Sequence, residues 1–179
     1  MNPAPNLVLV GPMGAGKSSL GRRVAQALGL QFVDADRRLE QLAGASIATI
    51  FEHEGEPGFR AREERLLGEL LQDQGLVLAT GGGAVLSSAT RERLRARAFV
   101  VHVQVGLEQQ LARLERDTLR PLLAQGDRRE TLSRLAAVRD PLYAEVADMV
   151  FASDGLGVDD AVRRLKARLA QAWHRSEVA

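Results

Sequence analysis

The sequence contains a glycine-rich loop that leads directly into a lysine and a serine. Residues 11–18 read Gly-Pro-Met-Gly-Ala-Gly-Lys-Ser and match the pattern G-x-x-x-x-G-K-[ST]. Glycines let such a loop point its N–H groups at phosphate oxygens, and the helix that follows adds its positive N-terminal end. We therefore predict a phosphate-binding loop, in which Lys17 reaches the β- and γ-phosphates and Ser18 is a ligand of Mg²⁺.

A dinucleotide site is the alternative for a glycine-rich loop of this kind. The pattern G-x-G-x-x-G, begun at Gly14, puts Ser19 where the third glycine belongs. That helix position requires close packing without a side chain, so the sequence disfavours a dinucleotide. The residues that we expect around ATP in this loop are Met13, Gly14, Ala15, Gly16, Lys17, Ser18 and Ser19.

Two aspartates follow the second predicted strand. Asp34 and Asp36 flank Ala35, and alternation along an extended chain would place both carboxylates on one side. Ligands of open α/β sheets bind at the carboxyl ends of strands. We predict that Asp34 holds Mg²⁺ through water and that Asp36 orients or deprotonates an acceptor hydroxyl. A helix N-cap and a solvated turn are the alternative for either residue alone.

Strands and helices alternate along the chain, which is typical of a parallel sheet covered by helices on both faces. We expect strands at residues 7–10, 30–33, 76–79, 98–105 and 149–152. We expect helices at about 18–28, 37–43, 46–53, 60–71, 107–116 and 158–172, and one from about 130. The predicted fold class is α/β, with three layers around a five-stranded parallel sheet and a phosphate-binding loop (P-loop) after its first strand.

Two segments are too long or too polar to be simple connections. About 40 residues separate the second and third strands, so we predict a helical substrate-binding subdomain at about residues 34–72. The polar stretch after residue 114 predicts a mobile lid at about 114–128. After the third strand come Gly81, Gly82 and Gly83, where a small ligand could lie against backbone N–H groups.

Composition bounds the class of protein. The chain of 179 residues is 45% hydrophobic and 26% charged, which fits a single domain over residues 1–179. A net charge of +1 is too small for nonspecific nucleic-acid binding. The chain has no cysteine, its three histidines are scattered, and no apolar run approaches a membrane span. We expect a cytoplasmic protein, most simply a monomer, without nucleic-acid or membrane partners.

Six motifs occur in one order along the chain. They are the loop at residues 11–18, Asp34-Ala35-Asp36, Phe59-Arg60 with Glu63, the triple glycine at 81–83, Arg120-Pro121-Leu122-Leu123, and Arg139-Asp140-Pro141-Leu142-Tyr143. Together they resemble the shikimate kinase family from Gly11 through Tyr143. The resemblance implies a nucleoside-monophosphate-kinase-like fold, ATP and shikimate as ligands, one Mg²⁺ with the ATP, and phosphorylation of the shikimate 3-hydroxyl in the route to chorismate and aromatic amino acids.

The resemblance also implies roles for individual residues. Arg60 and Arg139 would clamp the shikimate carboxylate, because a guanidinium fork suits that anion. Asp36 and the backbone at Gly82 would hold ring hydroxyls. The remaining implied roles are phosphate neutralisation by Arg120, adenine stacking by Arg113, fixing of the Arg60 guanidinium by Glu63, and lining of the ring pocket by Phe51 and Phe59. The alternatives are a solvated charge for Arg113, an ordinary exposed ion pair for Glu63, and a plain core role for both phenylalanines. Residues 153–157 lack the basic residue that some relatives place near the adenine.

Three other functions would explain part of these motifs. A gluconate kinase would explain the loop and the lid but not Arg60 and Arg139 on either side of the triple glycine. A nucleoside monophosphate kinase would need a second base pocket, for which no residues are evident. A non-catalytic ATP-binding regulator should lack one of Lys17, Ser18, Asp36 or Arg120, and all four are present.

Overall fold

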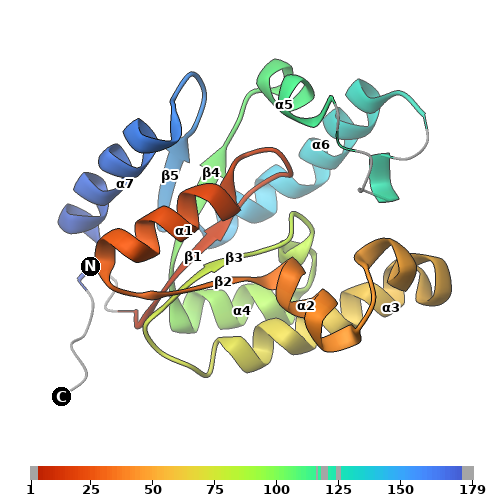
Figure 1. Cartoon of the computed structure of the whole chain (residues 1–179), viewed down its shortest axis with the longest axis horizontal. Coiled ribbons are helices and arrows are strands. Elements are labelled where there is room, and N and C mark those ends of the chain that lie inside the picture. Colours follow the sequence, from red (N-terminus) through yellow and green to blue (C-terminus); the bar gives the residue numbers. More distant parts are fainter. Residues whose placement is uncertain (1–3, 116, 118–120, 124–125, 175–179) are drawn as a thin grey trace.

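Five parallel strands form one sheet at the centre of the computed structural model, which describes residues 4–115, 117, 121–123 and 126–174 (Figure 1). The strands are β1 (Asn6–Val10), β2 (Gln31–Asp34), β3 (Leu76–Ala79), β4 (Ala98–Gln104) and β5 (Met149–Ala152). Their order is β2-β3-β1-β4-β5, and every pair is parallel. The predicted sheet is confirmed, with strand ends within one residue of those expected.

Helices occupy both faces of this sheet (Figure 1). They are α1 (Lys17–Leu28), α2 (Ala35–Ala43), α3 (Ile47–Leu70), α4 (Ser88–Arg97), α5 (Leu107–Leu114), α6 (Arg128–Val146) and α7 (Val158–Ala172), with short 3₁₀ turns η1 (Ala84–Leu86) and η2 (Pro121–Leu123). Sequence reasoning missed α4. Only Thr90 and Leu94 of that helix are buried, so it offers too few apolar residues for a helical period to be recognised.

Helix α3 joins two segments that the sequence predicted as separate helices. Gly55 lies inside it with φ 68° and ψ −178°, a conformation that interrupts the helical path. Pro57 follows two residues later, where its fixed φ suits the first turn of a new helical stretch. The kink turns the second stretch so that Phe59 and Arg60 lie at the cavity described below.

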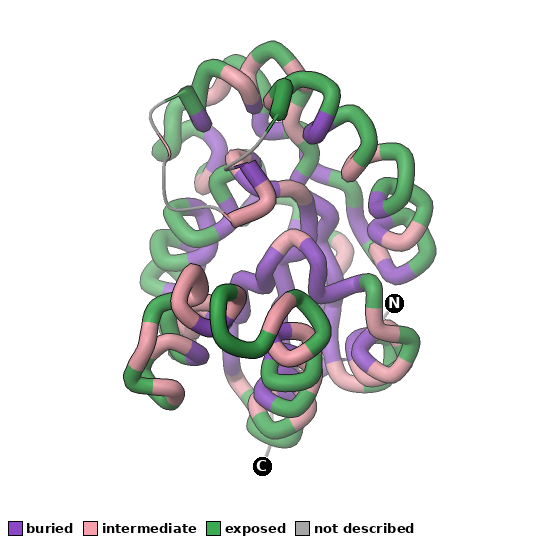
Figure 2. The backbone as a smooth tube through the Cα atoms, turned by 90° about the vertical axis from the view of Figure 1, so that its right-hand side faces the viewer, coloured by how far each residue is buried: buried purple, intermediate pink, exposed green. Residues whose placement is uncertain are grey.

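The core lies on the two faces of the sheet. In β1, Leu7 and Leu9 pack toward α1 and α7, whereas Val8 and Val10 pack toward α3, α4 and α6. Figure 2 shows the buried strands between helices whose outer sides are exposed. Because both faces are covered, β1 and β3 are buried throughout and read as continuous apolar runs in the sequence.

Two smaller apolar clusters lie beside the sheet. Leu39, Ile50, Phe59 and Leu66 form one between α2 and α3, within the segment predicted as a substrate-binding subdomain. The other includes Met13 of the phosphate-binding loop and described residues of the predicted lid, Leu114 and Leu123. The division into subdomain and lid stays a prediction, and part of the 114–128 segment lies outside the described residues.

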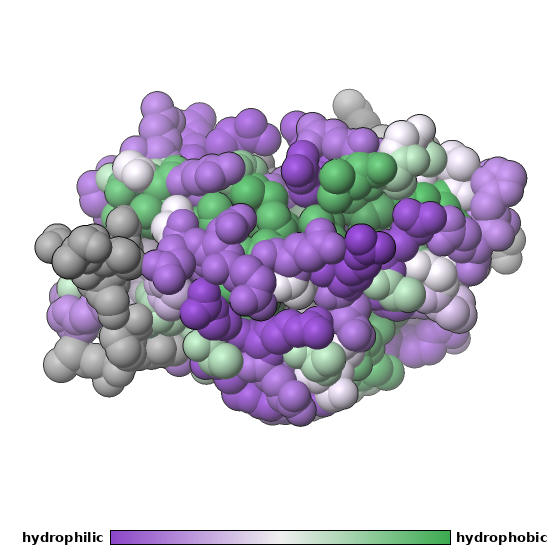
Figure 3. Space-filling view, turned by 90° about the horizontal axis from the view of Figure 1, so that it is seen from below, coloured by the Kyte–Doolittle hydropathy of each residue, from purple (hydrophilic) through white to green (hydrophobic). Residues whose placement is uncertain are grey.

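The outer surface is predominantly polar. Figure 3 shows a face covered mostly by hydrophilic side chains, with hydrophobic ones gathered in smaller groups. Across the described ranges, the structure contains no helix with the length and apolar character of a membrane span.

His102 is an unusual buried polar residue of β4. It is 3% exposed, pairs with Val10 of β1 in the sheet register, and packs against the ring of Tyr143. Its Nδ1 atom is buried without a hydrogen-bond partner among the described residues. Burial, and to a lesser extent the charge of nearby Lys17, lower the pKa of His102 to about 4. The imidazole is therefore neutral near pH 7.

We expect this histidine to make the folded state sensitive to mild acid. An unfolded His with a pKa near 6.5 takes up a proton as the pH falls, whereas folded His102 resists protonation down to about pH 4. Between pH 7 and pH 5 the free energy of unfolding should fall by about 2 kcal/mol through this residue alone.

Urea unfolding at both pH values, with His102→Phe beside the wild type, measures that contribution. The variant should lose the His102 share of the pH dependence, while His53→Phe, which alters an exposed histidine, should retain it. An identical pH dependence in the wild type and His102→Phe would contradict the assignment.

Candidate active site

The phosphate-binding loop connects β1 to α1 at the carboxyl end of the sheet. Gly11, Gly14 and Gly16 have φ values of 141°, 77° and 89°, which residues with side chains rarely adopt. A side chain at Gly11 would also collide with the carbonyl oxygen of Val103 in β4. The glycines thus allow the chain to turn sharply against the sheet and to begin α1 at Lys17.

Lys17 is held within the loop that precedes it. Its Nζ donates to the carbonyl oxygens of Gly11 and Pro12, each at 2.8 Å, and the side chain is largely buried. These bonds place a positive charge directly under the loop. An ammonium in this position favours the binding of an anion on the loop.

The next carbonyls of the loop are held by residues from other elements. Gln110 Nε2, Arg113 Nη1 and Ser153 Oγ donate in turn to the carbonyls of residues 13–15, at 2.8, 2.9 and 3.1 Å. In a trans peptide the N–H points opposite to the C=O, so these bonds direct the N–H groups of Gly14 and Gly16, which line the cavity, away from the donors, whereas the N–H of Ala15 donates to the Pro12 carbonyl at 3.3 Å. Side chains from other elements therefore hold the backbone of the loop in the conformation that it would present to an anion.

Two of these donors were missed by sequence reasoning. Gln110 and Ser153 are both 6% exposed, and nothing in their local sequence distinguishes them from solvated polar residues. The one usable signal was the spacing of Gln110 and Arg113, which places them one turn apart on α5. Arg113 also donates to the Ser153 carbonyl at 3.2 Å, so a charged side chain lies beside the loop at 153–157 that lacks its own basic residue.

Ser18 and Asp34 form a pair of oxygen donors beside the loop. Ser18 Oγ donates to Asp34 Oδ2 at 2.5 Å, and both residues line the same cavity. Asp34 also caps α2, because its Oδ1 accepts from the N–H of Arg37 at 3.2 Å. Hydroxyl and carboxylate oxygens are hard ligands that suit Mg²⁺. No cluster of three metal-binding side chains exists in the described part of the chain, so phosphate oxygens or waters would have to complete the coordination of such an ion.

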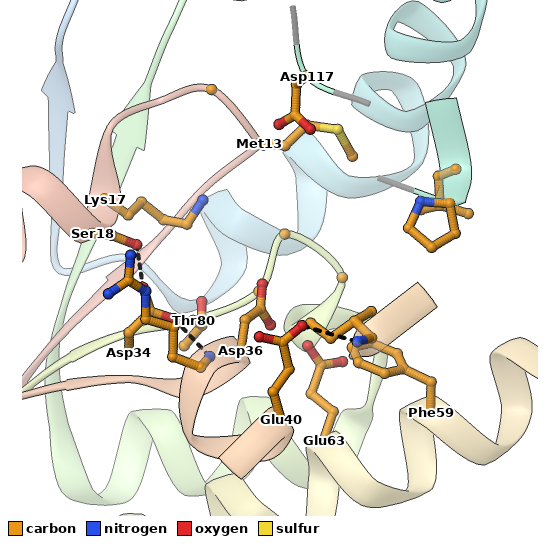
Figure 4. Close-up of a pocket in the computed structure, with 18 of the residues that line it drawn as sticks. Met13, Lys17, Ser18, Asp34, Asp36, Glu40, Phe59, Glu63, Thr80 and Asp117 are labelled. Carbon is orange, nitrogen blue, oxygen red and sulfur yellow. Dashed lines mark hydrogen bonds between the residues drawn. The ribbon is translucent and has the colours of Figure 1, made fainter. Parts of the chain in front are cut away.

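The position of Asp36 differs from the expectation. Helix α2 begins at Ala35, so Asp36 belongs to the first helical turn and not to an extended strand. The prediction that both aspartates lie on an extended strand was therefore wrong, because Asp34 caps α2 and the helix begins at the next residue. Asp36 nevertheless lines the same cavity as Asp34, and Figure 4 shows it between Lys17 and Glu63.

The triple glycine is where oppositely charged groups converge. A Cβ at Gly81 would lie 2.5 Å from Glu63 Oε1 and 2.9 Å from Asp36 Oδ1, and one at Gly83 would overlap the Arg60 guanidinium. Only residues without side chains leave room for these contacts. Because this chain's own side chains occupy the space beside Gly81 and Gly83, direct contact of a ligand with this backbone is a prediction chiefly for Gly82.

Glu63 is a buried carboxylate in this cluster. Its Oε2 accepts from Arg60 Nη1 at 2.7 Å, which agrees with the expectation that it fixes the guanidinium. Burial raises the pKa of Glu63, the charge and hydrogen bond of Arg60 lower it, and the charge of Asp36 raises it again. The carboxylates of Glu63 and Asp36 therefore interact electrostatically across Gly81.

Arg139 is the second arginine of the site and comes from α6. It is 5% exposed, and among the described residues no carboxylate lies within salt-bridge distance of it. Burial lowers the pKa of Arg139, and the positive charge of Arg60 lowers it further. Two guanidinium groups that repel each other at one cavity would be stabilised by a bound anion.

The cavity that joins these groups has a volume of about 590 Å³. Predicted site residues that line it are Met13, Gly14, Gly16, Lys17, Ser18, Ser19, Asp34, Asp36, Arg60, Glu63, Gly81, Gly82, Gly83, Arg113 and Arg139. Ala15 is not among the lining residues, and Arg120 lies outside the described residues. Phe51 and Phe59 also line it, with ring centroids 4.8 Å apart.

Several charged lining residues had not been predicted from the sequence. Arg37 and Glu40 of α2 line the cavity beside Asp36, and Asp117 lies across it near Met13 (Figure 4). Glu40 Oε1 accepts from the N–H of Ile47 at 3.0 Å, which ties α2 to the start of α3. Isolated charges on a helix, such as Arg37 and Glu40, or in a polar connection, such as Asp117, look solvent-exposed in a sequence, so no local signal identified them.

The chain is similar to known proteins over nearly its whole length. The family model described as shikimate kinase matches residues 13–170. A shikimate kinase of Stenotrophomonas maltophilia is 49% identical over 178 residues, which cover 99% of each chain. The solved structure of a shikimate kinase from Acinetobacter baumannii in complex with shikimate is 45% identical, with a TM-score of 0.89 and 94% of each chain covered.

A more distant likeness concerns the fold alone. A gluconokinase from Sinorhizobium meliloti is 19% identical, with a TM-score of 0.60 and coverage of 95% of this chain and 94% of its own. The gluconate kinase alternative thus has a related fold but lacks the full-length identity found above. With the phosphate-binding loop, the acidic pair and both arginines around one cavity, and the matched family model covering residues 13–170, the chain belongs to the shikimate kinase family.

Proposed function

We propose that this kinase transfers the γ-phosphate of ATP to the 3-hydroxyl of shikimate, giving ADP and shikimate 3-phosphate. One observation carries the proposal: a single cavity has an anion-binding loop on one side and Arg60 and Arg139 on another, with Asp36 between them. A phosphate donor and an acceptor with a carboxylate and hydroxyls match these three features. The relative from Acinetobacter baumannii was solved with shikimate bound.

The donor is proposed to bind along the loop at residues 11–18. Its phosphates would accept hydrogen bonds from the loop N–H groups, and Lys17 would move from the loop carbonyls toward the β- and γ-phosphates. Ser18 and Asp34 would hold Mg²⁺, which neutralises charge on the phosphate oxygens when it is bound. Arg113 would lie against the adenine, because it borders both the loop and the segment at 153–157.

The acceptor is proposed to bind between Arg60 and Arg139, which would clamp its carboxylate. Glu63 would hold the Arg60 guanidinium in place through the 2.7 Å contact. Asp36 would then accept a hydrogen bond from the reacting hydroxyl and take its proton as the new P–O bond forms. Glu63 lies beside Asp36, since both carboxylates reach the space next to Gly81.

Transition-state stabilisation falls to the cations around the transferring group. In a loose phosphoryl transfer the charge spreads over the equatorial oxygens, so positioning and electrostatics dominate the rate. Lys17 is proposed for this role, and so is Arg120 from the sequence resemblance alone. Closure of the segment at 114–128 would exclude water and prevent hydrolysis of ATP. A cytoplasmic monomer stays the expectation from the sequence.

The reaction can be tested by coupled measurement of ADP release with MgATP and four acceptor conditions: shikimate, quinate, gluconate and none. Strong stimulation by shikimate alone is expected. Stimulation by gluconate would refute shikimate as the acceptor but would leave the proposed ATP site unchanged. ATP binding without turnover under any of the four conditions would favour a non-catalytic ATP-binding regulator.

Substitution of Lys17 should abolish most catalysis. Lys17→Ala removes the charge aimed at the transferring phosphate, and kcat should fall by about 100-fold or more while the fold remains intact. Steady-state kinetics and circular dichroism measure both quantities. Lys166→Ala is the matched control, because Lys166 is an exposed residue of α7 and the only other lysine. Near-normal turnover of Lys17→Ala would remove the role assigned to the loop lysine.

Substitution of Arg139 should affect the acceptor more than the donor. Arg139→Ala removes a charge-assisted hydrogen bond to the carboxylate, so KM for shikimate should rise by about 10- to 100-fold and KM for ATP by less than about twofold. The matched control is Arg134→Ala, which alters an exposed arginine of the same helix. An equal rise of both KM values would refute a specific carboxylate contact.

A further inference from the structure

Tyr143 lies one helical turn after Arg139 on α6 and belongs to no role described above. Its side chain is 1% exposed and is among the largest fully buried ones of the described chain. The ring packs on His102 of β4, with ring centroids 4.9 Å apart. Tyr143 is thus fixed between α6 and the sheet, directly behind the acceptor side of the cavity.

The hydroxyl of Tyr143 has a specific partner, since it donates a hydrogen bond to the carbonyl oxygen of Gly82. Burial raises the pKa of Tyr143, and the positive charge of Arg139 offsets part of that rise. The phenol therefore keeps its proton at neutral pH and remains a donor. This bond joins α6 to the middle residue of the triple glycine across a sequence separation of 61 residues.

Gly82 lies where the two halves of the cavity meet. A Cβ on it would be 3.4 Å from Arg139 Nη1, 3.5 Å from the N atom of Met13 and 3.6 Å from the carbonyl oxygen of Gly11. Movement of this peptide would therefore disturb Arg139, the proposed carboxylate ligand, whereas the phosphate-binding loop on the other side is also held by the side chains that donate to its carbonyls.

The hydrogen bond also sets the direction of a peptide plane. With the Gly82 carbonyl turned toward Tyr143, the N–H of Gly83 in the same trans peptide points away from α6. Glycine has unusually free backbone torsions, so three in succession do not hold such an orientation by themselves. The turn has one bond of its own, from the N–H of Ala84 to the carbonyl oxygen of Gly81 at 3.2 Å, and the Tyr143 hydroxyl adds a bond from outside the loop that acts on the central peptide directly.

We propose that Tyr143 is a positioning residue of the acceptor site: its hydroxyl fixes the Gly82–Gly83 peptide, and through it the position of Arg139 relative to the bound acceptor. The inference rests on the proposed function, because it assumes that shikimate occupies this side of the cavity. A purely structural tyrosine would contribute to stability without distinguishing the acceptor from ATP.

Tyr143→Phe tests the proposal because it retains the ring and its packing on His102 and removes only the hydroxyl. The Gly82 carbonyl then loses its donor, and the peptide is free to adopt other orientations. Shikimate binding, measured by isothermal titration calorimetry without nucleotide, should weaken about tenfold. KM for shikimate should rise to a similar extent, while KM for ATP should change by less than about twofold.

A matched control is Thr131→Val, which removes a buried hydroxyl from the same helix, far from Gly82. It should leave both KM values and the calorimetric Kd unchanged. Thermal unfolding of both variants reports any general loss of stability. A lower Tm of Tyr143→Phe with unchanged Kd and KM values would overturn the proposal in favour of a structural role, as would an equal rise of KM for shikimate and ATP.

Measurements on the wild-type protein distinguish failure of this inference from failure of the proposed function. If wild-type protein shows shikimate-dependent ADP release and Tyr143→Phe binds shikimate normally, only the role of Tyr143 is refuted. If the wild type neither binds nor phosphorylates shikimate, the acceptor assignment fails, and the role of Tyr143 fails with it.

Discussion

The direction of a few peptide planes in the loop between β1 and α1 is the constraint on which the site depends. A phosphate can bind there only if N–H groups face the cavity, and a glycine-rich backbone does not select that arrangement unaided. The carbonyls of the loop accept hydrogen bonds from four side chains, and these bonds hold the peptide planes in one orientation. The four donors are Lys17, Gln110, Arg113 and Ser153. The sheet and its helices serve to bring these four donors to one loop.

On the acceptor side of the cavity the backbone is again glycine-rich, and here charged side chains pack against it. Glycines at 81–83 leave space that Asp36, Glu63 and Arg60 fill, so opposite charges are packed closely beneath the cavity. Arg60 is already paired with Glu63, whereas buried Arg139 has no carboxylate within salt-bridge distance among the described residues, so a bound anion would chiefly stabilise Arg139. A family of enzymes that binds a small carboxylate can obtain both affinity and orientation from this pairing.

Much of the fold could be predicted because its signals are local. Short apolar runs that alternate with helical segments identified all five strands, and the Gly29 stop and the apolar face of α1 identified that helix. Helix α4 was missed because it buries only Thr90 and Leu94. Asp36 was assigned to an extended segment because the cap formed by Asp34, which starts α2 early, cannot be distinguished in sequence from a strand end.

The sequence by itself determined which chemistry is available: the loop motif, the acidic pair, the separated arginines and the triple glycine are all readable in order along the chain. Only the tertiary structure decided how those groups are held. Gln110, Ser153 and Tyr143 act on backbone carbonyls between 61 and 138 residues away in the chain. Such contacts leave no local pattern, because a carbonyl is present at every position and the fold alone selects which one a side chain meets.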